Sequence, residues 1–584
     1  MSNIIGIWMG IDAGACIVKN GKIACAISEE RLSRIKHCTG FPELSLKYIL
    51  DYSKTKPEEV NSVAINSRKS LRYLYHLLKY NNFRSFSKNI YKKFFKQKEL
   101  AGNYHNPSIF SYKRPINFKE ELTKLKINAK IYNINHHEAH LNYAYYTSGF
   151  KNTLALSIDG EGDGISGILA KFTNGEMKIY QKIGIHGQSF GLTYGCITEA
   201  LGFSVNDGEG KTMGLAAYGK VNDTLLKDLS IIFPKIKNKK LISQIYWDYL
   251  TITDNEGKPK TFFRDSYYIR TLVHKYGKEN VAAAAQFLLE KTLLSWLKQV
   301  LKGEKKQKLV LAGGVALNIS NNSSLLASNL FEKVFIPPAP GDNGLPVALA
   351  LSQSEKFNER IKEPLVKPYL GKDYTSDEVF TSYKKIKKDF GYIKLKNVER
   401  NIALLLCKGF VIGWFHGRSE WGNRALGGRS VIADPRREDM KNKINLHLKQ
   451  RDWFMPFAPS VLADYGSKIF KNHCDSIFMN HRFFLRKEWI RKVPAIVHVD
   501  GSARPNFVHR ETNLKYYNLI SEFMKITNIP LILNTSFNKH GLPIVETPHD
   551  ACQHLEWKCI ELLSIEDYLI FPKKSYQIIK KTIN

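Results

Sequence analysis

Two histidines four residues apart give the sequence its clearest candidate for metal chemistry. His136 and His140 lie in the segment from Asn135 to Leu141, which we expect to be helical after a short strand at 122–132. On a helix, both imidazoles lie on one face, one turn apart. Two imidazoles joined by carboxylates from elsewhere make a compact site for a divalent cation. A pair of ordinary surface or core histidines is the alternative interpretation of this spacing alone.

Two aspartates that follow predicted strands offer the missing carboxylates. Asp159 comes directly after an apolar strand at 154–158, and Asp342 comes soon after a short strand at 334–336. Ligands of an open α/β sheet bind at the carboxyl ends of its strands. Each aspartate alone is better explained as a turn residue or helix cap. Together with the two histidines they form a predicted metal set, which suits iron, zinc or manganese.

The elements that position these residues repeat in the first half of the chain. The first copy, 4–30, consists of a strand, a turn at 10–14, a second strand, the pair Asn20-Gly21 and a third strand. The second copy, 152–183, has Asn174-Gly175 in the same place. Asn-Gly is a strong signal for a two-residue hairpin turn. The repeat predicts two similar lobes facing a cleft.

A glycine pair predicts a nucleotide contact later in the chain. The apolar strand 308–312 enters Gly313-Gly314, and a helix is expected to follow. A strand, a glycine pair and a helix start can bind a nucleotide at the helix N-terminus.

Length and composition are those of a globular protein of several domains. At 584 residues the chain is too long for one core. It has no uninterrupted apolar run of about 18 residues, which predicts no membrane span. The segment 1–6 lacks the features of a secretory signal. The eight cysteines form no C-x-x-C pair, which favours a reduced, cytoplasmic setting.

The charge balance is strongly basic, at +33 from 87 Lys and Arg against 54 Asp and Glu. Such a balance fits nucleic acid, an anionic membrane surface or anionic substrates. The amino-acid usage of an AT-rich genome explains it equally well. The densest run, Lys79 to Lys98, mixes basic with aromatic residues. This run can bind a polyanion, or it can form an amphipathic helix that packs on the rest of the protein.

Short motifs spread over nearly the whole chain occur in the order found in one known family. They are 28–37, 41–42, 136–140, 159–160, 208–216, 313–314 and 340–342 in the first part, and 423–430, 434–436, 456–460, 498–504 and 534–538 in the second. The sequence thereby resembles the carbamoyltransferase family, which includes nodulation and antibiotic-pathway O-carbamoyltransferases. Each motif alone is weak, but so many in one order make a chance match very unlikely.

The resemblance implies an α/β protein with two domains. Residues 1–355 would form a two-lobed actin-like ATPase (ASKHA) domain that contains the metal, similar to the universal tRNA threonylcarbamoyl-transfer enzyme. Residues 356–369 would be a linker. Residues 370–584 would form a YrdC-like α/β domain, similar to enzymes that make carbamoyl-adenylate.

The resemblance also implies a transferase of a one-carbon group. Carbamoyl phosphate and ATP would react in the second domain to give carbamoyl-adenylate and pyrophosphate. The carbamoyl group would then pass, at the metal of the first domain, to an acceptor hydroxyl on a small molecule. Fe(II) is the usual metal of the family, with other divalent ions as alternatives, and Mg²⁺ is a further candidate that would accompany ATP.

Site residues carried over from the family fall into two sets. In the second domain, the need for fixed positive charge beside two anions is met by Arg424, Lys449 and Arg504 at the phosphates, with Arg429 and Ser536 at the nucleotide. An ion pair at the surface is the alternative for any one arginine. In the first domain the adenylate would contact Asp159, Gly160, Gly313, Gly314 and Asn318.

The sequence departs from the family pattern at two positions. Ile11 replaces the histidine of a His-Asp pair, which leaves Asp12 as the candidate catalytic base, with an imidazole such as His37 nearby. Met455 replaces an arginine expected at carbamoyl phosphate. Arg451 and Arg436 are the candidates to compensate for it.

Three functions remain open from the sequence. The first is an ATP-dependent O-carbamoyltransferase that acts on a small hydroxylated metabolite. The second is the same chemistry on a nucleic-acid base or tRNA nucleoside, which the basic charge favours. The third is a non-catalytic, regulatory binding protein, which only Ile11 and Met455 favour.

Overall fold

The computed structural model describes residues 2–66, 117–242, 245, 249–254, 256–263, 266–357, 359 and 364–583. The chain divides into two compact units, Met1–Leu365 and Val366–Asn584. This division falls inside the predicted linker at 356–369. The basic and aromatic run from Lys79 to Lys98 lies outside the described residues.

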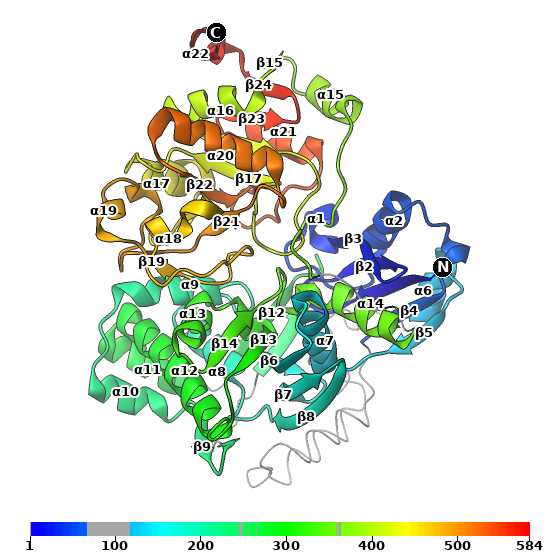
Figure 1. Ribbon diagram of the computed structural model, residues 1–584, viewed down its shortest axis with the longest axis vertical. Coiled ribbons are helices and arrows are strands. Elements are labelled where there is room, and N and C mark those ends of the chain that lie inside the picture. The colour runs from blue at the N-terminus through cyan, green and yellow to red at the C-terminus, as the bar shows by residue number, and fades with distance from the viewer. Residues whose placement is uncertain are drawn as a thin grey trace. The chain divides into compact units, whose positions relative to one another are not determined.

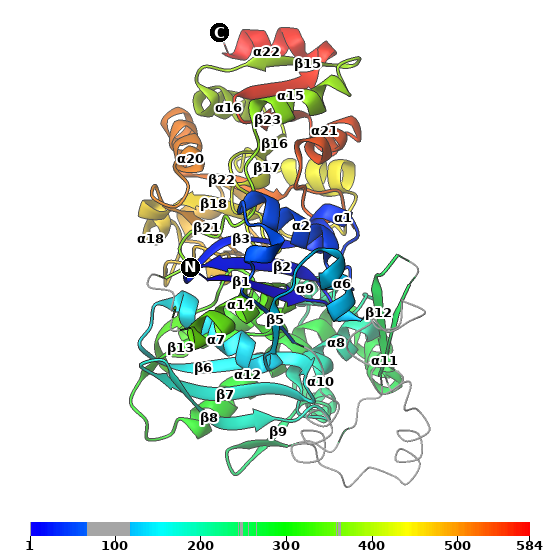
Figure 2. The same ribbon diagram turned by 90° about the vertical axis from the view of Figure 1, so that its right-hand side faces the viewer.

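Unit 1 contains two five-stranded sheets with the same strand order and directions. In the first sheet, the order β3-β2-β1-β4-β5 combines three antiparallel strands with two parallel ones. The second sheet repeats this with the order β8-β7-β6-β13-β14. This duplicated arrangement is that of the two-lobed actin-like fold, so the prediction of two similar lobes in an α/β protein is confirmed (Figures 1 and 2). The strands are β1 (Asn3–Trp8), β2 (Gly14–Lys19), β3 (Lys22–Ser28), β4 (Ser62–Ile65), β5 (Lys130–Asn133), β6 (Asn152–Gly162), β7 (Ile165–Thr173), β8 (Glu176–Ile183), β13 (Gln307–Ala312) and β14 (Phe331–Phe335), with two separate hairpins, β9 (Lys235–Lys237) with β10 (Lys240–Ile242) and β11 (Tyr249–Thr253) with β12 (Pro259–Phe263).

The equivalent hairpins of the two lobes turn on the Asn-Gly pairs. Asn20 and Gly21 have φ of 49° and 74°, and Asn174 and Gly175 have φ of 50° and 97°. Two successive residues with positive φ form the two-residue turn that matches the twist of antiparallel strands, and Asn and Gly adopt it at the least cost. The sequence signal and the backbone therefore agree in both lobes.

Two helices, α7 and α14, pack against each other and connect the two sheets of unit 1. α14 contacts β1 and β2 of the first sheet, and α7 contacts β6 and β13 of the second. Figure 2 shows the pair between the two sheets. Gly6 allows the close approach of α14 to β1, since a Cβ there would lie 2.0 Å from the carbonyl oxygen of Pro346. The helices of unit 1 are α1 (Glu29–Ser33), α2 (Glu43–Tyr52), α6 (Phe118–Lys124), α7 (His136–Ser148), α8 (Phe190–Ala200), α9 (Glu209–Leu215), α10 (Asp223–Ser230), α11 (Tyr267–Tyr276), α12 (Lys278–Val300), α13 (Ile319–Ala327) and α14 (Leu345–Lys356).

The strand predicted at 122–132 is wrong over its first part. Leu122 lies in helix α6, and the strand β5 begins only at Lys130. The Asn117 side chain accepts the backbone N–H of Glu120 and caps the helix, and Leu122 is buried on its inner face. The cap and the single buried leucine make a short amphipathic helix that the apolar residues alone do not predict.

Unit 2 is an α/β domain built on one mixed eight-stranded sheet, in the order β15-β24-β23-β16-β17-β22-β18-β21. Among the described residues, no helix of either unit is long and apolar enough to cross a membrane. The strands are β15 (Phe390–Lys394), β16 (Ile412–Phe415), β17 (Arg429–Ala433), β18 (Ala458–Leu462), β21 (Asn506–Val508), β22 (Leu531–Ser536), β23 (Leu562–Ile565) and β24 (Tyr568–Pro572), with β19 (Phe483–Phe484) and β20 (Ser502–Ala503) paired separately. The helices are α15 (Ser376–Lys384), α16 (Val398–Cys407), α17 (Met440–Asn442), α18 (Gly466–Ile469), α19 (Lys487–Ile490), α20 (Leu514–Thr527), α21 (Pro548–Glu556) and α22 (Tyr576–Ile583).

Candidate functional site

Helix α7 carries both predicted histidine ligands, as the four-residue spacing requires. Its N-cap, Asn135, accepts the backbone N–H of Glu138 through its side chain. Gly149 ends the helix with a φ of 72°. The side chains of His136 and His140 are buried, and their rings meet edge to face at 4.8 Å.

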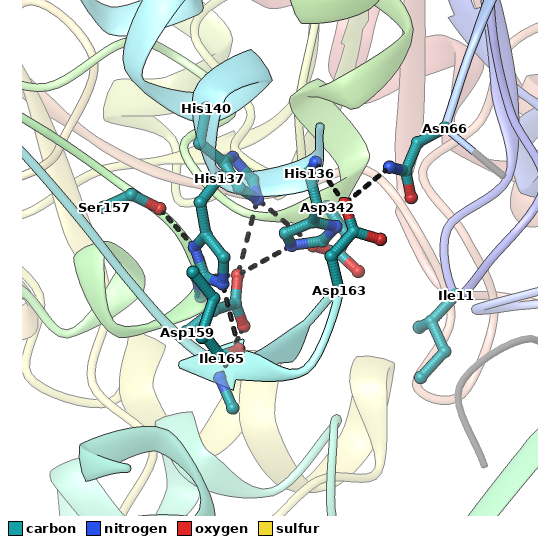
Figure 3. A network of polar contacts seen from close by, with 12 residues as sticks. Ile11, Asn66, His136, His137, His140, Ser157, Asp159, Asp163, Ile165 and Asp342 are labelled. Carbon is teal, nitrogen blue, oxygen red and sulfur yellow. Dashed lines mark hydrogen bonds and ion pairs between the residues drawn. The ribbon is translucent and has the colours of Figure 1, made fainter. Parts of the chain in front are cut away.

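The two predicted aspartates join the histidines in one cluster (Figure 3). His140 Nε2 lies 3.4 Å from both Asp159 Oδ2 and Asp342 Oδ1. His136 Nε2 lies 3.9 Å from Asp159 Oδ2 and 3.5 Å from Asp342 Oδ1. β6 continues to Gly162, beyond the predicted end at 158, so Asp159 lies within this strand, after its apolar part. Asp342 follows β14, which is separated from β6 in the same sheet by β13. The structure thus brings together four residues that span more than 200 positions of sequence.

The cluster fits a divalent metal ion. Ligand atoms held at about 2.0–2.2 Å from one ion lie about 3.0–3.6 Å from each other, close to the distances above. His136 Nε2, His140 Nε2 and Asp342 Oδ1 are inaccessible to solvent and have no hydrogen-bond partner within the described part of the chain. Buried polar atoms without partners are rare, and a shared cation would satisfy all three.

The pKa values of the cluster are those of a site that holds protons and releases them when a cation binds. Burial lowers the pKa of His140, but the nearby carboxylates of Asp159 and Asp342 outweigh burial and raise it to about 9. Burial and the Asp159 charge raise the pKa of Asp342. Burial opposes ionisation of Asp159, yet the two histidines hold its pKa well below its usual range. Two carboxylates so close together require positive charge, which protons supply when no cation is bound.

The third histidine of α7, His137, does not face the cluster. Its Nδ1 lies 2.8 Å from Ser157 Oγ, and its Nε2 lies 3.1 Å from the Ile165 carbonyl oxygen (Figure 3). Burial, together with the charges of His136 and His140, holds its pKa well below the ordinary value. Neutral His137 therefore donates from Nε2 to the Ile165 carbonyl oxygen and accepts the Ser157 hydroxyl at Nδ1. These two hydrogen bonds connect α7 to β6 and β7.

Asp159 also links the cluster to the predicted adenylate contacts. Its Oδ1 accepts the N–H of Gly160 at 2.7 Å, and its Oδ2 accepts the N–H of Gly314 at 2.8 Å. Gly313 has a φ of 92°, and a Cβ there would lie 2.2 Å from the Ile158 carbonyl oxygen. Asn318 is the N-cap of α13, since its Oδ1 accepts the N–H of Asn321.

Asp12 pairs with the imidazole named from the sequence. His37 Nδ1 lies 2.6 Å from Asp12 Oδ1, and His37 Nε2 lies 3.3 Å from Asp207 Oδ1. Burial lowers the pKa of His37, but Asp12, Asp207 and Glu30 outweigh it and raise the pKa to about 10. His37 is therefore an imidazolium at neutral pH, and any proton acceptor in this group is a carboxylate. Sequence reasoning did not find Asp207, which directly precedes the 208–216 motif.

Ile11, which precedes Asp12, has an aliphatic side chain that takes part in none of the marked contacts of Figure 3. Its carbonyl oxygen accepts the indole N–H of Trp8 at 2.7 Å. The Trp8 ring in turn packs edge to face against the His136 ring at 5.6 Å.

In unit 2 the structure brings Lys449 and Ser536 together. Lys449 Nζ donates to the Ser536 carbonyl oxygen at 2.6 Å and lies 3.1 Å from Ser536 Oγ and 3.2 Å from Asn538 Oδ1. Lys449 ends a π-helical segment, Lys443–Lys449, and is almost fully buried. π-helical turns are rare and are frequent at functional sites. Asn538, at the end of the 534–538 motif, joins this group.

Three arginines near one another form a second cationic group in unit 2. Burial lowers the pKa of Arg504 well below its ordinary value, and the charges of Arg424 and Arg451 lower it further. Burial lowers the pKa of Arg424 and of Arg451 to about 10. Arg504 Nε and Arg451 Nη2 are inaccessible to solvent and have no hydrogen-bond partner within the described residues. Cations held this way are best satisfied by an anionic ligand.

Arg451, and not Arg436, belongs to this group. The Arg451 guanidinium lies 4.4 Å from the centre of the Phe457 ring, and its Nε donates to Asn445 Oδ1. Arg436 instead forms a bidentate pair with Asp434, at 2.6 Å for the shorter contact. A guanidinium bound to a carboxylate in this way is already neutralised.

Arg429 has a different environment from the three arginines. It is fully buried, with Nη1 donating to the carbonyl oxygens of Gly417 and Gly428. Its guanidinium stacks on the Phe415 ring at 3.6 Å. The contacts tie Arg429 to the backbone of unit 2, and its predicted role at the nucleotide stays a prediction.

Comparison with known proteins agrees with the motifs over both units. A family model described as "Carbamoyltransferase N-terminus" matches residues 3–351, and one described as "Carbamoyltransferase C-terminus" matches residues 403–571. The nodulation protein NolNO of Sinorhizobium fredii is 31% identical over 96% of this chain and 78% of its own length. An uncharacterized protein of Methanocaldococcus jannaschii is 33% identical over 94% of this chain and 95% of its own. The solved structure of component A of the (R)-2-hydroxyglutaryl-CoA dehydratase of Acidaminococcus fermentans matches 61% of this chain and 99% of its own with a TM-score of 0.33 and 12% identity.

Proposed function

The chain belongs to the carbamoyltransferase family and is a transferase, and from this we propose that it is an ATP-dependent O-carbamoyltransferase. In unit 2, carbamoyl phosphate, ATP and water would give carbamoyl-adenylate, phosphate and pyrophosphate. In unit 1, the oxygen of an acceptor hydroxyl would attack the carbamoyl carbon, and AMP would leave. The acceptor class we propose is a small hydroxylated metabolite.

The observation that carries this proposal is the presence of two cationic groups in unit 2. Carbamoyl phosphate and the triphosphate of ATP repel each other, so a site that joins them needs several fixed positive charges. Arg424, Arg451 and Arg504 supply guanidinium forks, and Lys449 supplies a point charge next to Ser536. The proposed roles are phosphate binding for the three arginines and Lys449, and nucleotide binding for Ser536.

In unit 1, His136, His140, Asp159 and Asp342 would hold the metal ion, for which we propose Fe(II). A bound divalent cation supplies Lewis-acid polarisation of a carbonyl or phosphoryl oxygen. The main-chain N–H groups of Gly160 and Gly314 are oriented by Asp159, so the adenylate would lie beside them. Mg²⁺ would accompany ATP in unit 2.

Asp12 is the proposed base for the acceptor hydroxyl. A carboxylate is a weak base for an alcohol, so it must act together with polarisation of the carbamoyl group. His37 would hold the Asp12 carboxylate in place and, as an imidazolium, would not accept the proton itself.

A direct test is carbamoylation of hydroxylated acceptors detected by mass spectrometry. The metal-loaded protein is incubated with isotopically labelled carbamoyl phosphate, ATP and pools of small polyols and sugars, with RNA in a parallel arm. We expect the labelled carbamoyl group on a small acceptor, in a reaction that requires ATP. Label on RNA alone would replace the proposed acceptor class by nucleic acid, and label that does not require ATP would contradict the adenylate route.

A further inference from the structure

The turn between β6 and β7 contacts helix α7 directly beside the metal cluster. The turn residues are Asp163 and Gly164, with φ of 52° and 84°. Asp-Gly suits such a turn for its backbone alone, so the turn explains why residue 163 is a small polar residue. It does not explain where the Asp163 side chain goes.

The Asp163 side chain reaches back to the first residue of α7. Its Oδ2 accepts the backbone N–H of His136 at 2.9 Å, and the same oxygen accepts the Asn66 amide at 3.1 Å (Figure 3). Asp163 is 7% exposed and Asn66 is 9% exposed. A carboxylate at the N-terminus of a helix satisfies a free N–H and favours the helix dipole.

The residue before Asp163 fixes the ring of the same histidine. A Cβ at Gly162 would lie 2.1 Å from Cδ2 of His136, so the imidazole packs directly on the backbone of the last residue of β6. The β6–β7 hairpin therefore contacts His136 twice, at its backbone N–H and at its ring.

Asn66 connects this turn to the other lobe of unit 1. It directly follows β4, and its amide also donates to the Ile134 carbonyl oxygen at 2.8 Å, just before α7. Ile134 itself donates its N–H to the Ile65 carbonyl oxygen at 2.8 Å. The first turn of α7 is thus tied to both sheets through two side chains.

We propose that Asp163 and Asn66 are positioning residues that fix His136 for metal binding. This goes beyond the four ligands and rests on the proposed metal site of unit 1. Residues that orient a ligand without touching the ion change metal affinity by about 10–100-fold when they are removed. The competing explanation is that Asp163 serves only the hairpin turn.

Three substitutions separate these explanations. Asp163→Gly removes the carboxylate and keeps the left-handed turn, since glycine adopts it freely. Asp163→Asn keeps the turn and one acceptor oxygen but removes the charge. Asn174→Gly is the matched control, because Asn174 occupies the same position in the next two-residue turn of the same sheet, between β7 and β8.

The measurement is the Kd of Co²⁺, determined by titration with a competing chelator, together with the visible absorption spectrum of the bound ion. We expect Asp163→Gly to weaken Co²⁺ binding by about 10–100-fold and to alter the spectrum. Asp163→Asn should weaken it only several-fold, and Asn174→Gly should change neither quantity. Asn66→Ala should weaken binding, and Asn66→Ala combined with Asp163→Gly should be no weaker than Asp163→Gly alone.

The outcomes also distinguish this inference from the metal site itself. If the parent binds Co²⁺ and Asp163→Gly binds it equally well with the same spectrum, the positioning role is wrong and the metal site stands. If the parent binds no Co²⁺, both are wrong. Thermal unfolding of the metal-free variants checks that a lost affinity does not come from a lost fold, and Asp163→Asn supplies the answer if Asp163→Gly does not fold.

Discussion

Lys449 Nζ lies 3.1 Å from Ser536 Oγ, although the two residues are 87 positions apart in the sequence. Lys449 comes from a π-helical segment, and Ser536 is the last residue of β22, an interior strand of the sheet of unit 2. This contact joins the residue proposed for the phosphates to the one proposed for the nucleotide. The Lys449 ammonium and the Ser536 hydroxyl, which we propose to bind the phosphates and the nucleotide, therefore lie within one hydrogen-bonded group.

Replacing Lys449 by Met should abolish adenylation. The substitution keeps the length of the buried side chain and removes the charge that binds between Ser536 and Asn538. We expect carbamoyl-phosphate-dependent pyrophosphate release to fall by at least about 100-fold, since charge stabilisation of this kind contributes several kcal/mol. Lys443→Met is the control, because Lys443 Nζ pairs with Glu561 at 2.7 Å. This variant should keep the rate of pyrophosphate release within a few-fold of the parent. Equal losses in both variants would argue against the role of Lys449.

Arg451 should matter more for carbamoyl phosphate than Arg436. Arg451→Met removes a guanidinium whose Nη2 has no partner in the described structure, whereas Arg436→Met removes one already bound to Asp434. We expect the KM for carbamoyl phosphate to rise by about 10-fold or more for Arg451→Met, from the loss of a charged hydrogen bond of about 1.5–3 kcal/mol. Steady-state kinetics of the two variants decide the point. The reverse order would identify Arg436 as the residue that makes up for Met455.

His140→Ala should remove the metal from unit 1 without affecting the reaction proposed for unit 2. The variant removes one of the four proposed ligands, so the metal content measured by mass spectrometry should fall from near one ion per chain to a small fraction of that. Carbamoyl-phosphate-dependent pyrophosphate release, which we propose for unit 2, should persist. His137→Asn is the control on the same helix, since His137 bonds to Ser157 and Ile165 and not to the cluster. This variant should bind the metal as the parent does. Metal retained by His140→Ala would show that the cluster is not the metal site.

The His37 ion pairs should stabilise the fold at neutral pH and lose this effect in alkali. The pKa of His37 is raised from 6.5 to about 10 in the folded protein, so its contribution is complete below pH 6.5 and is lost as the pH rises through 10. Thermal unfolding of the parent and of His37→Gln should differ by a few degrees near neutrality, from about 1–2 kcal/mol. The difference should shrink steadily toward pH 10. A difference that stays constant over this range would contradict the raised pKa.

Local patterns predicted the cluster of two histidines and two aspartates and the repeated lobes. The spacing of His136 and His140 is a property of one helix, and the Asn-Gly turns at 20–21 and 174–175 fix their own backbone. Asp159 lies within β6, just after its apolar part, and Asp342 follows β14, which places both at one edge of a sheet. Short-range signals of this kind survive folding because the tertiary structure adds to them instead of opposing them.

The parts that the sequence did not predict depend on contacts between distant segments. Asp207 meets His37 across 170 residues, and no local pattern marks that pair. Arg451 and Arg436 look alike in sequence, and only the neighbours Asp434 and Phe457 distinguish them. The helix at 118–124 was missed because a side-chain cap, and not periodicity, defines its start.

The decisive measurement is pyrophosphate release from ATP, with and without carbamoyl phosphate and with no acceptor added. We expect release that requires carbamoyl phosphate, that is lost in Lys449→Met and that persists in His140→Ala. The contrary result is a folded protein that releases no pyrophosphate under any of these conditions, or that releases it equally without carbamoyl phosphate. Either result would contradict formation of carbamoyl-adenylate by unit 2.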